Sequence, residues 1–184
     1  MTSARLASLI EIAQQFHPRG ISPADERYTE TPEYLRAREA WRCASRNAES
    51  WQRVLVLLRE RATPAYRVRD LTVPYMHPSW RVALLREGTP FIAVGCVSVL
   101  APVFFCYGLQ GLEQDPQVVL RERPPEVAEG VAVIEWAIQE VFNYEPLSPE
   151  EALTVVPDVE IEHCPPGGST LLAALISNDL NHYV

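Results

Sequence analysis

The sequence predicts an α+β fold, a single domain over residues 1–184 in which helices pack on one antiparallel sheet of about four to six strands. Three observations support this prediction. The chain has 184 residues and an apolar fraction of 47%, enough for one domain with a substantial core. Runs rich in β-branched and aromatic residues lie between residues 66 and 107, and stretches with helical periodicity flank them. The chain shows neither an internal repeat nor a linker composition.

The N-terminal part of the chain predicts helices. Residues 3–16 have the pattern of a short amphipathic helix. The tripeptide TPE at 31–33 is typical of a helix start, and the helix runs to about residue 61. A break near residues 45–47, which would give two helices, is the alternative. The apolar face of this segment contains Ala37, Trp41, Ala44, Ala48, Trp51, Leu55 and Leu58.

Residues 91–109 contain no charged side chain, and this length meets the minimum for a membrane-spanning helix. The run is, however, rich in valine, isoleucine and aromatic residues, which favour strands, and Pro102 divides it. We therefore predict two buried strands, over 91–100 and 103–107, with a membrane span as the less favoured alternative. A strand over 80–86, followed by a turn, completes a hairpin with the first of them.

The remaining elements follow from shorter patterns. Residues 66–75 alternate in part like a strand, and residues 126–142 form a second amphipathic helix. The sequence SPEE at 148–151 predicts the start of a short helix. Residues 158–162 alternate strictly between acidic and apolar side chains, as a half-buried strand does. For residues 170–180 the pattern leaves both a helix and a strand open.

The residues that usually carry catalysis or bind metals are scattered. The only neighbouring pair of potential metal ligands is His163-Cys164, without a second pair at zinc-site spacing. The sequence GGS at 167–169 matches no phosphate-binding motif. We therefore expect no catalytic residue, no metal and no cofactor. The cysteines, which form no CxxC pair, are expected to be buried free thiols: Cys43, Cys96, Cys106 and Cys164.

The N-terminus argues for a location inside the cell. Glu11 lies within the apolar stretch of the first helix, and no small-residue cleavage site follows it. This pattern is typical of an ordinary amphipathic helix and unlike that of a secretory signal. We therefore expect a cytoplasmic protein that makes no contact with a membrane.

Charge is distributed unevenly along the chain. Residues 1–86 hold 14 arginines and 9 acidic residues, a net charge of +5, whereas residues 87–184 hold 2 arginines and 15 acidic residues, a net charge of −13. The two halves can neutralise each other in the fold. Alternatively, an acidic surface is left to attract a basic partner. Because the whole chain has a net charge of −8, nucleic acid is a poor partner.

The helix over 126–142 contains one candidate binding surface. Its core stripe consists of Val127, Val131, Ile134, Ile138 and Phe142. Trp136 lies opposite this stripe, beside Glu129, Val133 and Glu140. A tryptophan surrounded by carboxylates on a polar face is typical of an interface anchor with a charged rim. A further layer of the fold that covers this face is the alternative.

A second candidate surface lies in the segment over 158–162. In a strand, Asp158, Glu160 and Glu162 would project to one side while Val159 and Ile161 project to the other. Such a row of carboxylates either protects a sheet edge from pairing with another chain or binds a basic ligand.

The sequences YTETPEYLRAREAW at 28–41 and VGCVSVLAPVFFCYG at 94–108 resemble those of myxobacterial immunity proteins of polymorphic toxin systems. These small bacterial proteins act in the cytoplasm and neutralise toxins delivered by neighbours or made by the cell itself. The chain is also acidic and lysine-free and has the same general organisation. The resemblance implies a tight complex with one cognate protein toxin, and it assigns no site residues.

The sequence therefore favours an immunity-type binding protein that neutralises a toxin through an acidic surface. The partner is expected to have a basic surface, and the oligomeric state is left open. A small cytosolic enzyme without a recognisable catalytic motif is the alternative. An enzyme would show a deep pocket with converging polar groups, whereas an inhibitor would show an exposed acidic patch with aromatic residues.

Overall fold

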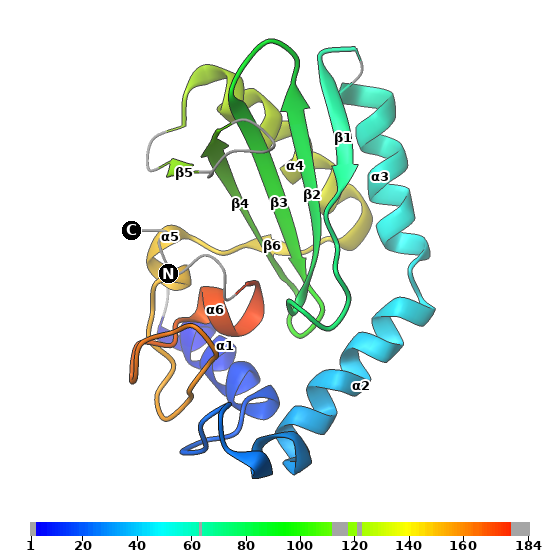
Figure 1. The fold of residues 1–184 in the computed structure, drawn as a ribbon. Coiled ribbons are helices and arrows are strands. Elements are labelled where there is room, and N and C mark those ends of the chain that lie inside the picture. Colours follow the sequence, from blue (N-terminus) through cyan, green and yellow to red (C-terminus); the bar gives the residue numbers. More distant parts are fainter. Residues whose placement is uncertain (1–2, 63, 112–117, 121–122, 178–184) are drawn as a thin grey trace.

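A mostly antiparallel sheet runs through the middle of the structure (Figure 1). The computed structural model describes residues 3–62, 64–111, 118–120 and 123–177. Five strands follow one another in chain order, and the sixth, β6, pairs in parallel with β4. The strands are β1 (Tyr66–Asp70), β2 (Ser79–Arg86), β3 (Phe91–Ser98), β4 (Val103–Gln110), β5 (Val118–Leu120) and β6 (Glu145–Pro146). The predicted α+β class and the predicted range of strand number are confirmed.

The helices lie close to where the sequence predicts them. They are α1 (Ser3–Phe16), α2 (Pro32–Arg46), α3 (Glu49–Ala62), α4 (Pro125–Phe142), α5 (Pro149–Ala152) and α6 (Leu171–Leu175), with a 3-10 helix, η1 (Glu26–Glu30). The break between α2 and α3 confirms the two-helix alternative. Asn47 causes it, because its backbone leaves the helical region and its side-chain amide donates to the carbonyl of Cys43 at 3.1 Å.

The uncharged run forms the two central strands, as predicted. Gly95 of β3 pairs with Cys106 of β4, and nearly every residue of the two strands is buried. Strands covered on both faces become continuously apolar, which explains the absence of charge. In the described ranges, no helix combines the length and the apolar character needed to cross a membrane.

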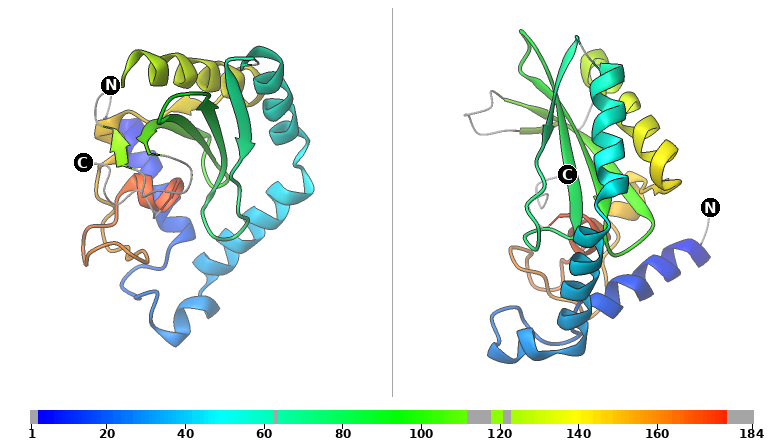
Figure 2. Two further views of the ribbon diagram at one scale, coloured as in Figure 1. Left: turned by 45° about the horizontal axis from the view of Figure 1, so that its top comes forward. Right: turned by 90° about the vertical axis from the view of Figure 1, so that its right-hand side faces the viewer.

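Helices α3 and α4 lie together on one face of the sheet (Figure 2). Two glycines allow α4 to approach closely, because a Cβ atom at Gly95 would overlap Ile134, and one at Gly130 would lie 2.8 Å from the Cβ of Ala93. The core on this face is dominated by large side chains, among them Trp41, Trp51, Trp80, Leu84, Phe104 and Ile138. We call it the α3–α4 core.

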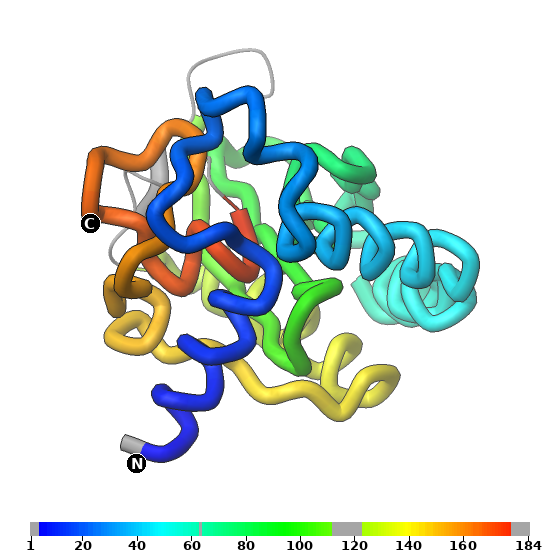
Figure 3. The backbone as a smooth tube through the Cα atoms, turned by 90° about the horizontal axis from the view of Figure 1, so that it is seen from below, coloured from blue at the N-terminus to red at the C-terminus, as the bar shows by residue number. Residues whose placement is uncertain are grey.

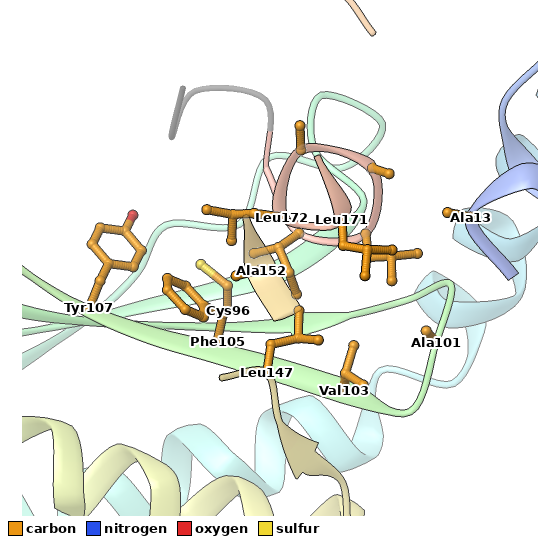
Figure 4. Packing of buried hydrophobic residues seen from close by; sticks show 14 of the residues in the cluster. Ala13, Cys96, Ala101, Val103, Phe105, Tyr107, Leu147, Ala152, Leu171 and Leu172 are labelled. Carbon is orange, nitrogen blue, oxygen red and sulfur yellow. The ribbon is translucent and has the colours of Figure 1, made fainter. Parts of the chain in front are cut away.

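The other face of the sheet contributes to a second core with α1, α5, α6 and the segment over 153–170. Figure 4 shows Phe105 and Cys96 of the sheet near Leu147, Leu171 and Leu172. Phe104 belongs to the α3–α4 core and its neighbour Phe105 to this second core, as the alternation of a strand requires. The sheet therefore separates two apolar layers.

The strand predicted over residues 158–162 is wrong. Asp158 and Glu162 lie in turns, Glu160 and Ile161 lie in irregular backbone, and the only bridge of the segment in the described structure joins Val159 to Arg19. Asp158 has a positive φ angle of 59°, which a continuous strand does not allow, and His163, directly after the segment, has one of 67°. The alternation nevertheless persists, because Val159 and Ile161 are buried in the second core.

The final segment, for which helix and strand were both open, contains helix α6. Thr170 caps its first turn by accepting a hydrogen bond from the backbone N–H of Ala173 at 3.3 Å. Residues from 178 onward lie outside the described residues.

Candidate functional site

The α4 residues predicted to bind a partner already make contacts within the fold. The guanidinium of Arg61, on α3, lies 4.2 Å from the centre of the Trp136 ring, and Trp136 and Val133 pack against the α3–α4 core. Glu129 accepts a hydrogen bond from the Tyr66 hydroxyl at 3.2 Å and pairs with Arg86 at 3.0 Å. Glu140 is exposed. A partner that bound Trp136 face-on would have to displace Arg61.

The arginine-rich and acid-rich halves neutralise each other in part. Arg5 pairs with Glu145 at 2.9 Å and with Glu151 at 3.4 Å, and Arg86 pairs with Glu129 as described above. Ion pairs this close to the surface contribute little to stability, but they reduce the acidic surface available to a partner.

The segment over 158–162 packs on the opposite face of the sheet from α4. Val159 and Ile161, which anchor this segment, belong to the second core, whereas Trp136 packs on the α3–α4 core. The structure therefore does not join the two predicted surfaces into one. Asp158 and Glu162 are exposed, and Glu160 is half-buried.

Glu162 lies at the rim of a pocket of about 450 Å³. We call it the tyrosine pocket. Figure 3 shows the chain segments around it, with the arm over 17–31 between α2 and the segment over 158–168. It is lined by Phe16, His17, Pro23, Tyr28, Tyr34, Ala37, Arg38, Trp41, Tyr75, Met76, His77, Pro78, Leu100, Ile161, Glu162 and Ala173.

The sequence of α2 sets one wall of the tyrosine pocket. Thr31 caps the helix by accepting a hydrogen bond from the backbone N–H of Tyr34 at 3.3 Å. Tyr34, Arg38 and Trp41 then follow at spacings of four and three residues, which place them on one helical face. The ring of Tyr28, on η1, meets that of Tyr34 edge-on at 5.6 Å.

The loop between β1 and β2 sets the opposite wall. Tyr75 has a φ of 67°, a left-handed conformation that is strained for a bulky residue. Its ring lies 6.0 Å from that of Trp41. Tyr75 and Met76, which line the pocket, are 54% and 63% exposed. They form an apolar projection at its mouth.

The two histidines of the pocket are held by the C-terminal segment. Nε2 of His17 lies 2.8 Å from the carbonyl oxygen of Ala174, and burial lowers the pKa of this histidine, which favours the neutral ring. Nδ1 of His77 lies 3.4 Å from the hydroxyl of Ser177. Because Ser177 is fully buried, its hydroxyl is not presented to a substrate as a nucleophile.

The thiols and carboxylates do not assemble a reactive centre in the described part of the chain. The expectation of buried thiols is confirmed for Cys96 and Cys106 and wrong for Cys43, which is exposed, while Cys164 is half-buried. Burial raises the pKa of the Cys96 and Cys106 thiols, which disfavours the reactive thiolate. Nowhere in the described ranges do three histidine, cysteine or acidic residues lie together as metal ligands do.

Sequence reasoning missed Tyr28, Tyr34, Tyr75 and Met76 as candidate residues. One signal was present: the sequence PYMHP at 74–78 places two large side chains between prolines, where neither a helix nor a central strand is expected. The convergence of this loop with α2 and η1 arises only from tertiary structure.

Two separate surfaces are thus the binding candidates, the tyrosine pocket with Glu162 at its rim and the α4 face around Trp136. The first is open and the second is covered in part by Arg61. Comparison of this chain with protein-family models, with curated proteins and with solved structures found no match.

Proposed function

We propose that this protein is an immunity-type inhibitor that acts in the cytoplasm by binding a cognate protein toxin and blocking it. The observation that carries the proposal is the exposed pair Tyr75 and Met76 beside an open aromatic pocket. Aromatic residues and methionine are enriched in protein interfaces, and tyrosine and tryptophan frequently dominate their binding energy. In this arrangement the projection and the pocket form the centre of the interface.

The charge of the chain supports a basic partner. The net charge is −8, and the exposed Glu162 lines the tyrosine pocket. Such a surface accelerates association with a positively charged toxin domain and repels acidic proteins. A second proposed contact lies on α4 and becomes available after Arg61 moves. It consists of Glu129, Val133, Trp136 and Glu140.

A growth assay tests inhibition directly. Genomic fragments from the organism that encodes this chain are expressed one at a time in a laboratory bacterium, with and without the protein. We expect at least one toxic fragment, encoding a basic domain, whose toxicity the protein suppresses. A fragment library that covers the genome and contains no neutralised toxin would overturn the proposal.

Two variants then locate the interface on the neutralised toxin. Tyr75→Ala/Met76→Ala removes the projection, and Glu129→Gln/Trp136→Ala/Glu140→Gln removes the α4 contact. We expect the first variant to weaken binding at least about tenfold, as truncation of a central anchor does, and the second to weaken it less. Both variants are checked for folding by urea denaturation before binding is measured by calorimetry.

A further inference from the structure

Tyr28, Tyr34 and Glu162 bring hydrogen-bond acceptors to the lining of the tyrosine pocket. The rings of Tyr28 and Tyr34 touch edge-on at 5.6 Å, and the Glu162 carboxylate lies near them. Burial, then the neighbouring Tyr34 and Glu162, raise the pKa of Tyr28 to about 12, which places its hydroxyl within the electrostatic reach of both. These side chains therefore provide oxygen atoms that can accept hydrogen bonds, and Nε2 of His163 lies 3.8 Å from the Glu162 carboxylate.

A second group of lining residues is aromatic and already contacts a guanidinium. The rings of Trp41 and Tyr75 lie 6.0 Å apart, and the guanidinium carbon of Arg38 lies 5.8 Å from the centre of the Tyr75 ring. Aromatic faces attract cations, and guanidinium groups also stack on them through their planar shape. The Tyr75 ring is thus placed to accept a planar cation at the mouth.

We infer that the tyrosine pocket binds a guanidinium group, with the Glu162 carboxylate and the Tyr28 hydroxyl as its acceptors and the exposed ring of Tyr75, which packs on the buried Trp41, as its aromatic wall. The acceptors need N–H donors, which a quaternary ammonium lacks, and the flat ring favours a planar group over a tetrahedral ammonium. The volume of about 450 Å³ accommodates an arginine side chain or a small organic ligand.

The identity of the molecule that carries this guanidinium rests on the proposed function. In that function the basic toxin inserts one of its arginine side chains into the pocket. A free alkylguanidinium would satisfy the same chemistry. The binding site itself can therefore be tested without a toxin, and the two sources can be separated.

A substitution of Arg38 distinguishes a cationic ligand of the pocket from an anionic one. It is exposed at the pocket, its described partner is the Tyr75 ring, and its charge repels a second cation. Arg38→Gln should therefore tighten the binding of a cation. For an anionic ligand, for which Arg38 would be the natural partner, the same substitution would weaken binding.

The methionines provide a local probe. The chain has 2 methionines, Met1 and Met76, and Met76 lines the pocket. With ¹³C-methyl methionine, the signal lost in Met76→Leu is assigned to Met76. Agmatine is titrated into the full-length protein, with tetramethylammonium and neutral butylurea as matched controls. For so small a ligand we expect a dissociation constant on the order of 1 mM for agmatine, and binding at least about tenfold weaker for both controls.

Variants connect the signal to the proposed acceptors. Glu162→Gln should weaken agmatine binding about tenfold, because a charge-assisted hydrogen bond is lost. Glu160→Gln removes the same charge two positions away, outside the lining of this pocket. This variant should change the affinity for agmatine less than about twofold. The inference is overturned if Met76 shows no saturable shift, if the two variants weaken binding equally, or if Arg38→Gln weakens it.

The toxin assay distinguishes this inference from the proposed function. A neutralised toxin without agmatine binding would overturn the guanidinium site and leave the inhibitor role standing. Agmatine binding without any neutralised toxin would support the site, assign it to a free guanidinium ligand and overturn the inhibitor role. If both occur, substitution of the arginines in the toxin's contact surface identifies the one that enters the pocket.

Discussion

The indole Nε1 of Trp41 donates a hydrogen bond to the backbone carbonyl of His77 at 2.8 Å, and so joins helix α2 to the loop between β1 and β2. Both residues are buried. This bond fixes the distance between the two walls of the tyrosine pocket, because Trp41 follows Tyr34 and Arg38 on one wall while His77 follows Tyr75 and Met76 on the other.

Trp41→Phe should therefore destabilise the protein and loosen the pocket. The substitution leaves the buried carbonyl of His77 without this donor, which costs about 1–3 kcal/mol of unfolding free energy. Trp51→Phe is the matched control, because the indole of Trp51 donates at 3.2 Å to the carboxylate of the exposed Asp70, which water can solvate. Urea unfolding should show a larger loss for Trp41→Phe. An equal loss would mean that ring volume alone decides.

Several elements of this fold could be predicted from local sequence. The two central strands were recognisable because 91–109 combines strand-forming residues with Pro102, and helix α2 because Thr31 and Pro32 mark its start. In each case the signal lies within the element itself. Neighbouring residues in the sequence were therefore enough.

The elements that were missed depend on distant contacts. Residues 158–162 alternate like a strand, yet they lie in turns and irregular backbone because they pack against the arm at Arg19 and Gly20, with the Gly20 N–H donating to the Asp158 carbonyl at 2.8 Å. The tyrosine pocket is likewise assembled from five separate parts of the chain. The helical periodicity places Trp136 opposite the core stripe, but α3 packs on α4, so that Trp136 packs against the α3–α4 core and Arg61 covers its ring.

The ring of Tyr75 is expected to strengthen binding, whereas the left-handed backbone at this position is expected to lower stability. Its φ of 67° suits glycine better than a bulky residue, so Tyr75→Gly should stabilise the protein relative to Tyr75→Ala by about 1 kcal/mol. Both variants lack the ring and should lose toxin and agmatine binding alike. Thermal unfolding measures the difference in stability. If the two variants unfold at the same temperature, the backbone at this position stores no strain.

The contact between Arg61 and Trp136 should contribute measurably to the packing of α3 on α4. A cation over an indole at 4.2 Å near the surface contributes about 0.5–1 kcal/mol. A double-mutant cycle with Arg61→Ala and Trp136→Leu should return a coupling energy of this size. Arg59→Ala, also exposed on α3, is the control and should show no coupling to Trp136→Leu. A coupling energy of zero would mean that Arg61 leaves the Trp136 ring free in solution.

The folded protein should lose stability as the solution becomes acidic. Because burial lowers the pKa of His17 in the folded protein, the unfolded chain binds a proton more readily at this residue, and acidification favours unfolding. Neutral His17 makes its full contribution to stability above pH 6.5, the pKa of histidine in the unfolded chain. This contribution declines as the pH falls from 6.5 toward the lower pKa of His17 in the folded protein. The slope from this one group is at most about 1.4 kcal/mol per pH unit.

Urea unfolding between pH 7.5 and pH 5.5 tests this, because carboxyl groups titrate mainly at lower pH. His17→Gln, whose amide can still donate to the Ala174 carbonyl, should flatten the pH dependence relative to the unsubstituted protein. A pH dependence that persists in His17→Gln would assign the loss of stability to another group. A flattened profile would show that the arm carrying His17 is held against α6 by a neutral imidazole, and so that this side of the tyrosine pocket loosens in acid.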